Sequence, residues 1–192
     1  MSVNLLNKVQ QNLNYPVLQK IDPNIQQEAP VHIVPDHPFG QAAIPAILTA
    51  LYKYVQSDKG AEDVLRGNES TDWVSKIFHD NHKDALAKIK EYSTDDAVYA
   101  ATKMNVIAHE AIGIMKENLP DKAGIKEVKT FFLNQRNNIL PYLPPELKLG
   151  DLLGDDTIDD NTNKMEGPIS SLVKSIGSAF SNPVTGEKEK TF

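Results

Sequence analysis

The chain has 192 residues, of which 40% are hydrophobic and 24% charged, and its formal net charge at pH 7 is −6. These values are typical of a globular protein with one domain, or one domain and an appendage. The acidic balance, with Arg66 and Arg136 as the only arginines, argues against nucleic-acid binding, which requires clustered cations, and the absence of cysteine excludes disulfides and thiolate metal sites.

No run of about 18 apolar residues is present, so we expect no membrane-spanning helix. The N-terminal residues lack the basic region and apolar run that are typical of a secretory signal. The sequence therefore predicts a cytoplasmic protein.

The first predicted element is a helical stripe with apolar residues spaced three and four apart. These residues are Leu5, Leu6, Val9, Leu13, Val17 and Ile21. Pro16 interrupts the stripe, so we expect a kink or a break into two short helices near Tyr15. Residues 22–39 contain four prolines and are expected to be mostly extended, with a short strand possible at 31–34.

Residues 41–55 form a strongly apolar pattern that predicts a buried helix, with Pro45 marking a bend or a late start. Ser57 or Asp58 is expected to cap a short helix that ends before Gly67.

Further helices follow at shorter intervals. We expect Ser70 to cap one that turns Trp73, Ile77 and Phe78 inward, and another to run over 83–92. Thr94 is expected to cap the longest helix, whose small residues would let a neighbouring helix, or a second copy of the chain, approach closely.

The long helix carries Asp95 and Asp96 in its predicted first turn and an inward face with six members. These members are Ala97, Ala101, Met104, Ala108, Ala111 and Met115. A last bundle helix begins near Ile125 and stops before Pro141.

This pattern predicts an all-α fold, an irregular multi-helix bundle over residues 1–150. Residues 151–167 are acidic and rich in turn formers, which predicts a flexible linker. Residues 168–192 are expected to form a short amphipathic helix and a polar tail. The apolar positions of that helix are Ile169, Leu172, Val173, Ile176 and Phe180.

Three stretches between 39 and 154 resemble the YidB-like bacterial family, a domain of unknown function. They are FGQAAIPAILTAL from Phe39, WVSKIF from Trp73 with ALAKIK from Ala85, and FLNQRNNILPYLPPEL from Phe132. The resemblance implies an all-α fold and assigns no functional residues. The Pro-rich stretch at 22–39 and the high charge depart from the family's pattern.

A divalent-metal site is the sharpest chemical alternative. His79, Asp80 and His82 lie in one short segment, and His109 on the long helix could add a further ligand. Such a set would suit a metal-dependent hydrolase. The alternative is that residues 79–82 are an exposed polar connection between two helices and bind no metal. The sequence favours this alternative.

Other motifs fail on specific residues. Gly113 stands where a zincin motif beginning at His109 needs its second histidine. The acidic stretch from Asp159 has Lys164 and Ser170 where a calcium loop needs glycine and glutamate. No phosphate-binding glycine loop occurs, so no cofactor is expected.

The sequence therefore favours a non-enzymatic interaction or scaffold module, with the metal-dependent hydrolase as the alternative. Protein partners or self-association are expected, and the 169–180 helix is the candidate docking element. Contact of residues 168–180 with a membrane surface is less favoured, because Lys174 is the only basic residue there.

Overall fold

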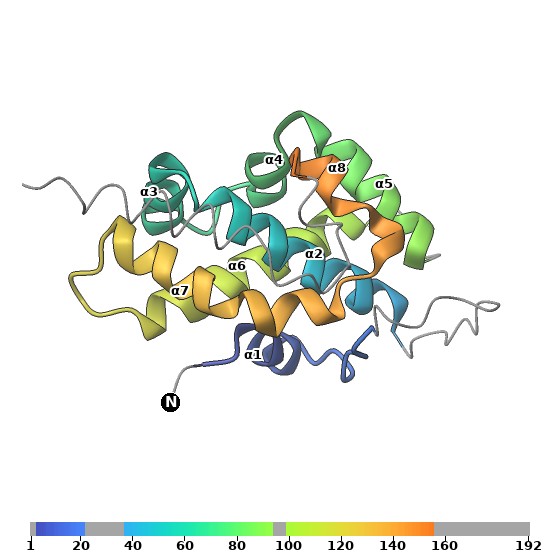
Figure 1. Ribbon diagram of the computed structural model, residues 1–192, viewed down its shortest axis with the longest axis horizontal. Helices are drawn as coiled ribbons and strands as arrows, with labels where there is room; N and C mark the ends of the chain where they lie inside the picture. The colour runs from blue at the N-terminus through green and yellow to red at the C-terminus, as the bar shows by residue number, and fades with distance from the viewer. Residues whose placement is uncertain (1–2, 22–36, 94–98, 156–192) are drawn as a thin grey trace, which may run out of the picture.

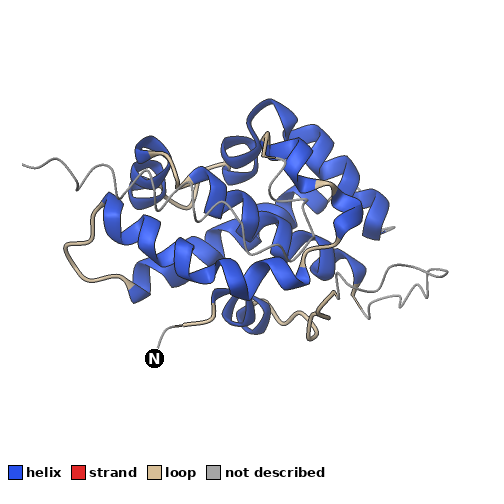
Figure 2. Cartoon of the chain, viewed as in Figure 1, coloured by secondary structure: helices blue, strands red, loops and turns tan. Residues whose placement is uncertain are grey.

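The computed structural model describes residues 3–21, 37–93 and 99–155. Helices in these ranges are α1 (Leu5–Asn12), α2 (Pro38–Tyr54), α3 (Asp58–Arg66), α4 (Trp73–Phe78), α5 (His82–Ser93), α6 (Ala100–Asn118), α7 (Ile125–Ile139) and α8 (Leu149–Leu153). Short 3₁₀ turns lie at His79–Asn81, Leu140–Tyr142 and Pro145–Leu147. The described residues contain no strand (Figure 2), so the predicted all-α bundle is confirmed.

Helix α2 runs through the middle of the bundle. Every residue from Phe39 to Tyr52 is buried, and α1, α4, α5, α6 and α7 pack against it. In Figure 1, α1 lies on one side of the bundle, and α4, α5 and α8 lie on the opposite side. The helix begins at Pro38, where His37 Nδ1 accepts the Gly40 N–H at 3.0 Å. Pro45 therefore lies inside the helix and does not mark a late start. Burial on all sides explains the width of the apolar pattern.

The N-terminal stripe folds differently from the prediction. Helix α1 ends at Asn12, Asn14 has a φ of 56°, and the chain then runs without helix to Ile21. Val17 is 84% exposed, whereas Leu18 is buried. The prediction of a second helix with Val17 facing inward was wrong, because the stretch is held by hydrogen bonds to groups elsewhere in the fold.

Buried glutamines hold the backbone on both sides of α1 by hydrogen bonds. Gln135 of α7 accepts the Leu5 N–H at 2.9 Å and donates to the Val3 carbonyl at 3.0 Å. Gln41 of α2 accepts the Gln19 N–H at 2.8 Å and donates to the Gln19 carbonyl at 3.0 Å. Each amide side chain thus pairs with backbone groups that have no partner within a helix and would otherwise lose their water on burial.

The caps of α3 and α4 show one success and one error. Ser57 caps α3 as predicted, and its hydroxyl accepts the Gly60 N–H at 2.9 Å. Asp72, not Ser70, caps α4 by accepting the Ser75 N–H at 3.2 Å. Asparagine 105 of α6 also donates to Asp72, at 3.0 Å, so this cap ties two helices together.

Gly67 follows α3 for a reason other than the one expected. Its φ is −59°, so no left-handed turn is formed there. A Cβ at this position would lie 2.1 Å from Cζ2 of Trp73. The close approach of the indole ring therefore requires glycine.

The small residues of the long helix face the core. Ala108 and Ala111 of α6 are fully buried, and α6 packs against α2. This face is therefore not available to a second copy of the chain in this fold. In the described residues α6 begins at Ala100, and the predicted cap and first turn at residues 94–97 lie outside them.

The packed core continues past residue 150. Leu149 and Leu152 of α8 are buried, and Asp155 forms an ion pair with Lys53 near the end of α2. The Asp155 N–H also donates to the Gly150 carbonyl at 2.9 Å. The described core therefore includes the first five residues of the predicted 151–167 linker. The predicted strand at 31–34 and the predicted helix at 169–180 lie outside the described residues.

Candidate functional site

The histidines of the candidate metal site make separate contacts. The His79 ring lies 5.9 Å from the Tyr54 ring, and the His109 ring lies 6.4 Å from the Trp73 ring. His82 Nδ1 is 2.7 Å from the His79 carbonyl oxygen. Over the described ranges, no group of three or more His, Cys, Asp or Glu side chains could hold a metal ion. His79, Asp80, His82 and His109 are thus not gathered into one ligand set.

A second polar cluster surrounds Tyr54 at the end of α2. Its hydroxyl donates to Asp63 Oδ2 at 2.6 Å, and Lys76 Nζ lies 3.5 Å from the same oxygen. Burial, followed by the hydrogen bond to Asp63, raises the pKa of Tyr54. The hydrogen bond from Tyr54 in turn lowers the pKa of the Asp63 carboxyl. Each polar group in this cluster has a hydrogen-bond or ion-pair partner within it. The cluster is therefore better described as a structural link between α2, α3 and α4 than as a reactive centre.

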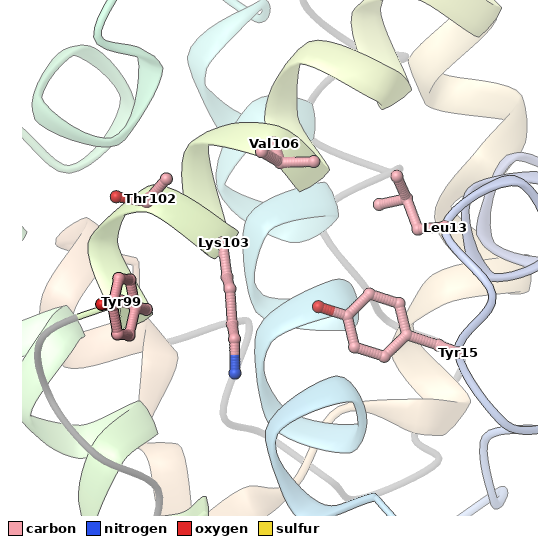
Figure 3. Close-up of a pocket in the computed structure, with 6 residues that line it drawn as sticks. All are labelled: Leu13, Tyr15, Tyr99, Thr102, Lys103 and Val106. Carbon is pink, nitrogen blue, oxygen red and sulfur yellow. The ribbon is translucent and has the colours of Figure 1, made fainter.

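An apolar groove lies on the opposite half of α2. Figure 3 shows Thr102, Lys103 and Val106 on the first turns of α6 and Tyr99 just before it. Leu13 and Tyr15 lie just after α1, and α2 passes between the two groups. The groove has a volume of about 300 Å³ and is lined by Leu13, Tyr15, Tyr99, Thr102, Lys103 and Val106. Four of these six side chains are aromatic or aliphatic, and none is a carboxylate or an imidazole.

The floor and wall of the groove are fixed by close contacts. Lys103 Nζ lies 5.0 Å from the ring centroid of Phe39, which is buried at the start of α2. The Tyr15 ring packs edge-on against His37, with centroids 5.0 Å apart. Asn12 at the end of α1 donates to Glu110 Oε1 of α6 at 2.6 Å and holds the two walls together. These contacts make the groove a built feature of the fold.

The rim of the groove exposes apolar side chains. Tyr99 is 66% exposed and Val106 is 46% exposed. Two large apolar side chains on one rim form a local patch, which is more informative than a scattered exposed leucine. The sequence pattern does not predict this groove. Val106 lies on a helix that is apolar on most sides, and the partner wall comes from a stretch for which we predicted a second helix.

The sequence-predicted docking residues Ile169, Leu172, Val173, Ile176 and Phe180 lie outside the described residues. No helix in the described ranges is long and apolar enough to cross a membrane. A second shallow depression lies between α5 and α8, and it is lined by Asn81, Asp84, Ala87, Lys88, Glu91, Asp151 and Leu152. Its mixed charges and polar lining give no preference for one class of ligand.

No family model, curated protein or solved structure matches the chain. The resemblance to the YidB-like family gains no support from these comparisons and stays a prediction.

Proposed function

We propose that this protein is a non-enzymatic interaction module, and that its groove binds an amphipathic helix from a protein partner. The observation that supports the proposal is the apolar groove between α1 and α6, with the exposed Tyr99 and Val106 on its rim. Tyrosines suit such a surface because each buries a large ring and keeps a polar tip in water.

The dimensions favour a helix as the bound element. Tyr99 and Val106 are seven residues apart along α6, which corresponds to about 10 Å of helix. An amphipathic helix presents apolar side chains at positions i, i+4 and i+7 over a similar length, which is the usual pattern of helix-in-groove recognition. Lys103 at the centre would favour a partner with an acidic or neutral flank.

The metal-dependent hydrolase remains the alternative from sequence, and no contact among the described residues favours it. Its three candidate histidine ligands make ring and backbone contacts that do not gather them around one point. Self-association through the alanine face of α6 is disfavoured for a different reason, since that face is already buried against α2.

A charge placed in the groove tests the proposal. Val106→Glu puts a carboxylate on a side chain that is 46% exposed, so the fold should be kept while a helix can no longer bury its apolar face there. Leu133→Glu is the matched control, because Leu133 of α7 is 36% exposed and does not line the groove.

We expect the wild-type chain and Leu133→Glu to retain similar amounts of the same protein from a native cell extract. Val106→Glu should retain at least tenfold less of that protein. The retained protein would then be purified, and its affinity for each variant measured by titration. Equal affinity for Val106→Glu and the control would contradict the proposal.

A further inference from the structure

The chain itself contains a segment with the pattern that the groove would bind. Leu172, Ile176 and Phe180 are spaced four residues apart, so on a helix they share one face over about 12 Å. The rim of the groove from Tyr99 to Val106 has a similar length. The spacing of the apolar residues in 169–180 therefore matches the length of the groove.

The end of the described chain is fixed at the end of α2 that lies away from the groove. Asp155 pairs with Lys53 near the C-terminal end of α2, whereas the groove lies over Phe39 at the N-terminal end of the same helix. Fourteen residues of helix separate Phe39 from Lys53, which corresponds to about 21 Å. The linker that follows must therefore cover at least about 21 Å to reach the groove.

The segment between residue 155 and the 169–180 helix is long enough to reach the groove. Residues 156–168 could span at most about 45 Å when fully extended. If they behave as the flexible linker that their composition predicts, their root-mean-square span is about 20 Å. A tether gives the highest local concentration when its average span matches the distance to the site, and that concentration is then on the order of 1 mM.

The charge balance does not oppose this docking. The described residues carry 16 Lys and Arg against 15 Asp and Glu, so the core is slightly basic. Residues 156–168 carry four carboxylates and one lysine. The acidic linker is thus not repelled by the net charge of the described part of the chain, over whose surface it would run.

We propose that residues 169–180 occupy the groove of their own chain and act as an internal competitor for the partner helix. This inference rests on the proposed function, because it assigns the regulation of the same groove. A segment that binds with a Kd of about 100 µM would fill the groove about 90% of the time at a local concentration of about 1 mM. It would weaken the binding of an external helix about tenfold.

Disulfide trapping in the full-length chain tests the proposal, because the protein contains no cysteine. Val106→Cys is combined with Leu172→Cys, Ile176→Cys or Phe180→Cys, so that one pair suits whichever register the helix adopts. A disulfide forms readily only when the two Cα atoms come within about 7 Å. Leu133→Cys, combined with the same three cysteines, gives the control pairs.

At about 5 µM protein, we expect one Val106 pair to form an intramolecular disulfide at least tenfold faster than every Leu133 pair. The product should have the mass of a monomer, because a local concentration of about 1 mM exceeds that of other molecules by about 200-fold. Equal rates for all pairs would overturn the proposal. A product found only as a dimer would overturn it in favour of a second copy as the occupant.

The two proposals can fail independently. If trapping fails but Val106→Glu still loses its partner, the groove binds a partner without internal competition. If trapping succeeds and Val106→Glu loses no partner, the groove is an internal packing site and the proposed function is wrong.

Discussion

Replacing Gln135 by methionine should destabilise the fold through one backbone group. The Gln135 side chain is 2% exposed, and its Oε1 atom accepts the N–H of Leu5, which is fully buried. Methionine has a similar unbranched shape and cannot accept that hydrogen bond. A buried N–H left without a partner costs about 1–3 kcal/mol.

The second hydrogen bond adds less. Gln135 Nε2 donates to the carbonyl of Val3, and Val3 is only partly buried, so water can replace this donor. We therefore expect Gln135→Met to lower the free energy of unfolding by about 2–3 kcal/mol. In a chain of this length that corresponds to a fall in Tm of roughly 5–10 °C.

Chemical denaturation followed by circular dichroism measures the change, with Asn134→Ala as the exposed neighbour on the same helix. The control should change the unfolding free energy by less than about 0.5 kcal/mol. Hydrogen exchange of the Leu5 amide should accelerate in Gln135→Met beyond what the global loss explains. A loss below about 0.5 kcal/mol in Gln135→Met would refute the reasoning that this glutamine fixes the N-terminal segment.

Three further predictions follow from the described contacts. Gly113→Ala should stabilise the protein by about 0.5–1 kcal/mol, because a Cβ there meets nothing within 4 Å. Gly67→Ala should lower the free energy of unfolding by about 1–3 kcal/mol, because its Cβ would meet the Trp73 ring. The melting temperatures of the two variants should therefore shift in opposite directions. Hydrogen bonds, first that from the Ser75 hydroxyl, lower the pKa of the Asp72 carboxyl. Its stabilisation is therefore complete above the unfolded-state pKa and is lost as the pH falls through the folded-state value. Asp72→Asn should be less stable than wild type by about 0.5–1 kcal/mol at pH 7, and this difference should shrink as the pH falls below the unfolded-state pKa. A difference in urea melts that stays constant as the pH is lowered would contradict the assignment. Truncation after residue 150 should lower Tm more than truncation after 155, because only the shorter chain loses the buried Leu152 and the Lys53–Asp155 ion pair.

Sequence rules that use only nearby residues predicted part of the fold correctly. The wide apolar pattern of 41–55 and the Ser57 cap both appear in the structure, because periodicity and capping depend on nearby residues. The N-terminal stripe failed for the opposite reason. Residues up to Ile21 are fixed by Gln10, Gln41 and the Pro141 carbonyl, and the last two partners are distant in sequence. Periodicity carries no information about such partners.

The candidate groove could not be predicted, because its two walls come from segments about 90 residues apart. Tyr15 reaches the groove because α1 ends at Asn12 and the chain turns there without entering the second helix that we predicted. The sequence did identify the amphipathic pattern at 169–180, and it remains a prediction. The histidine cluster was found from short-range spacing, and the described contacts separate its members.

Nuclear magnetic resonance of the ¹⁵N-labelled full-length chain tests most directly the claim that residues 169–180 occupy the groove. Spectra of the wild type and of Ile176→Glu would be compared at the same protein concentration. The account predicts that amide signals around Tyr15, Tyr99 and Val106 shift when the apolar face of 169–180 is disrupted. Changes confined to the neighbourhood of residue 176 would contradict it.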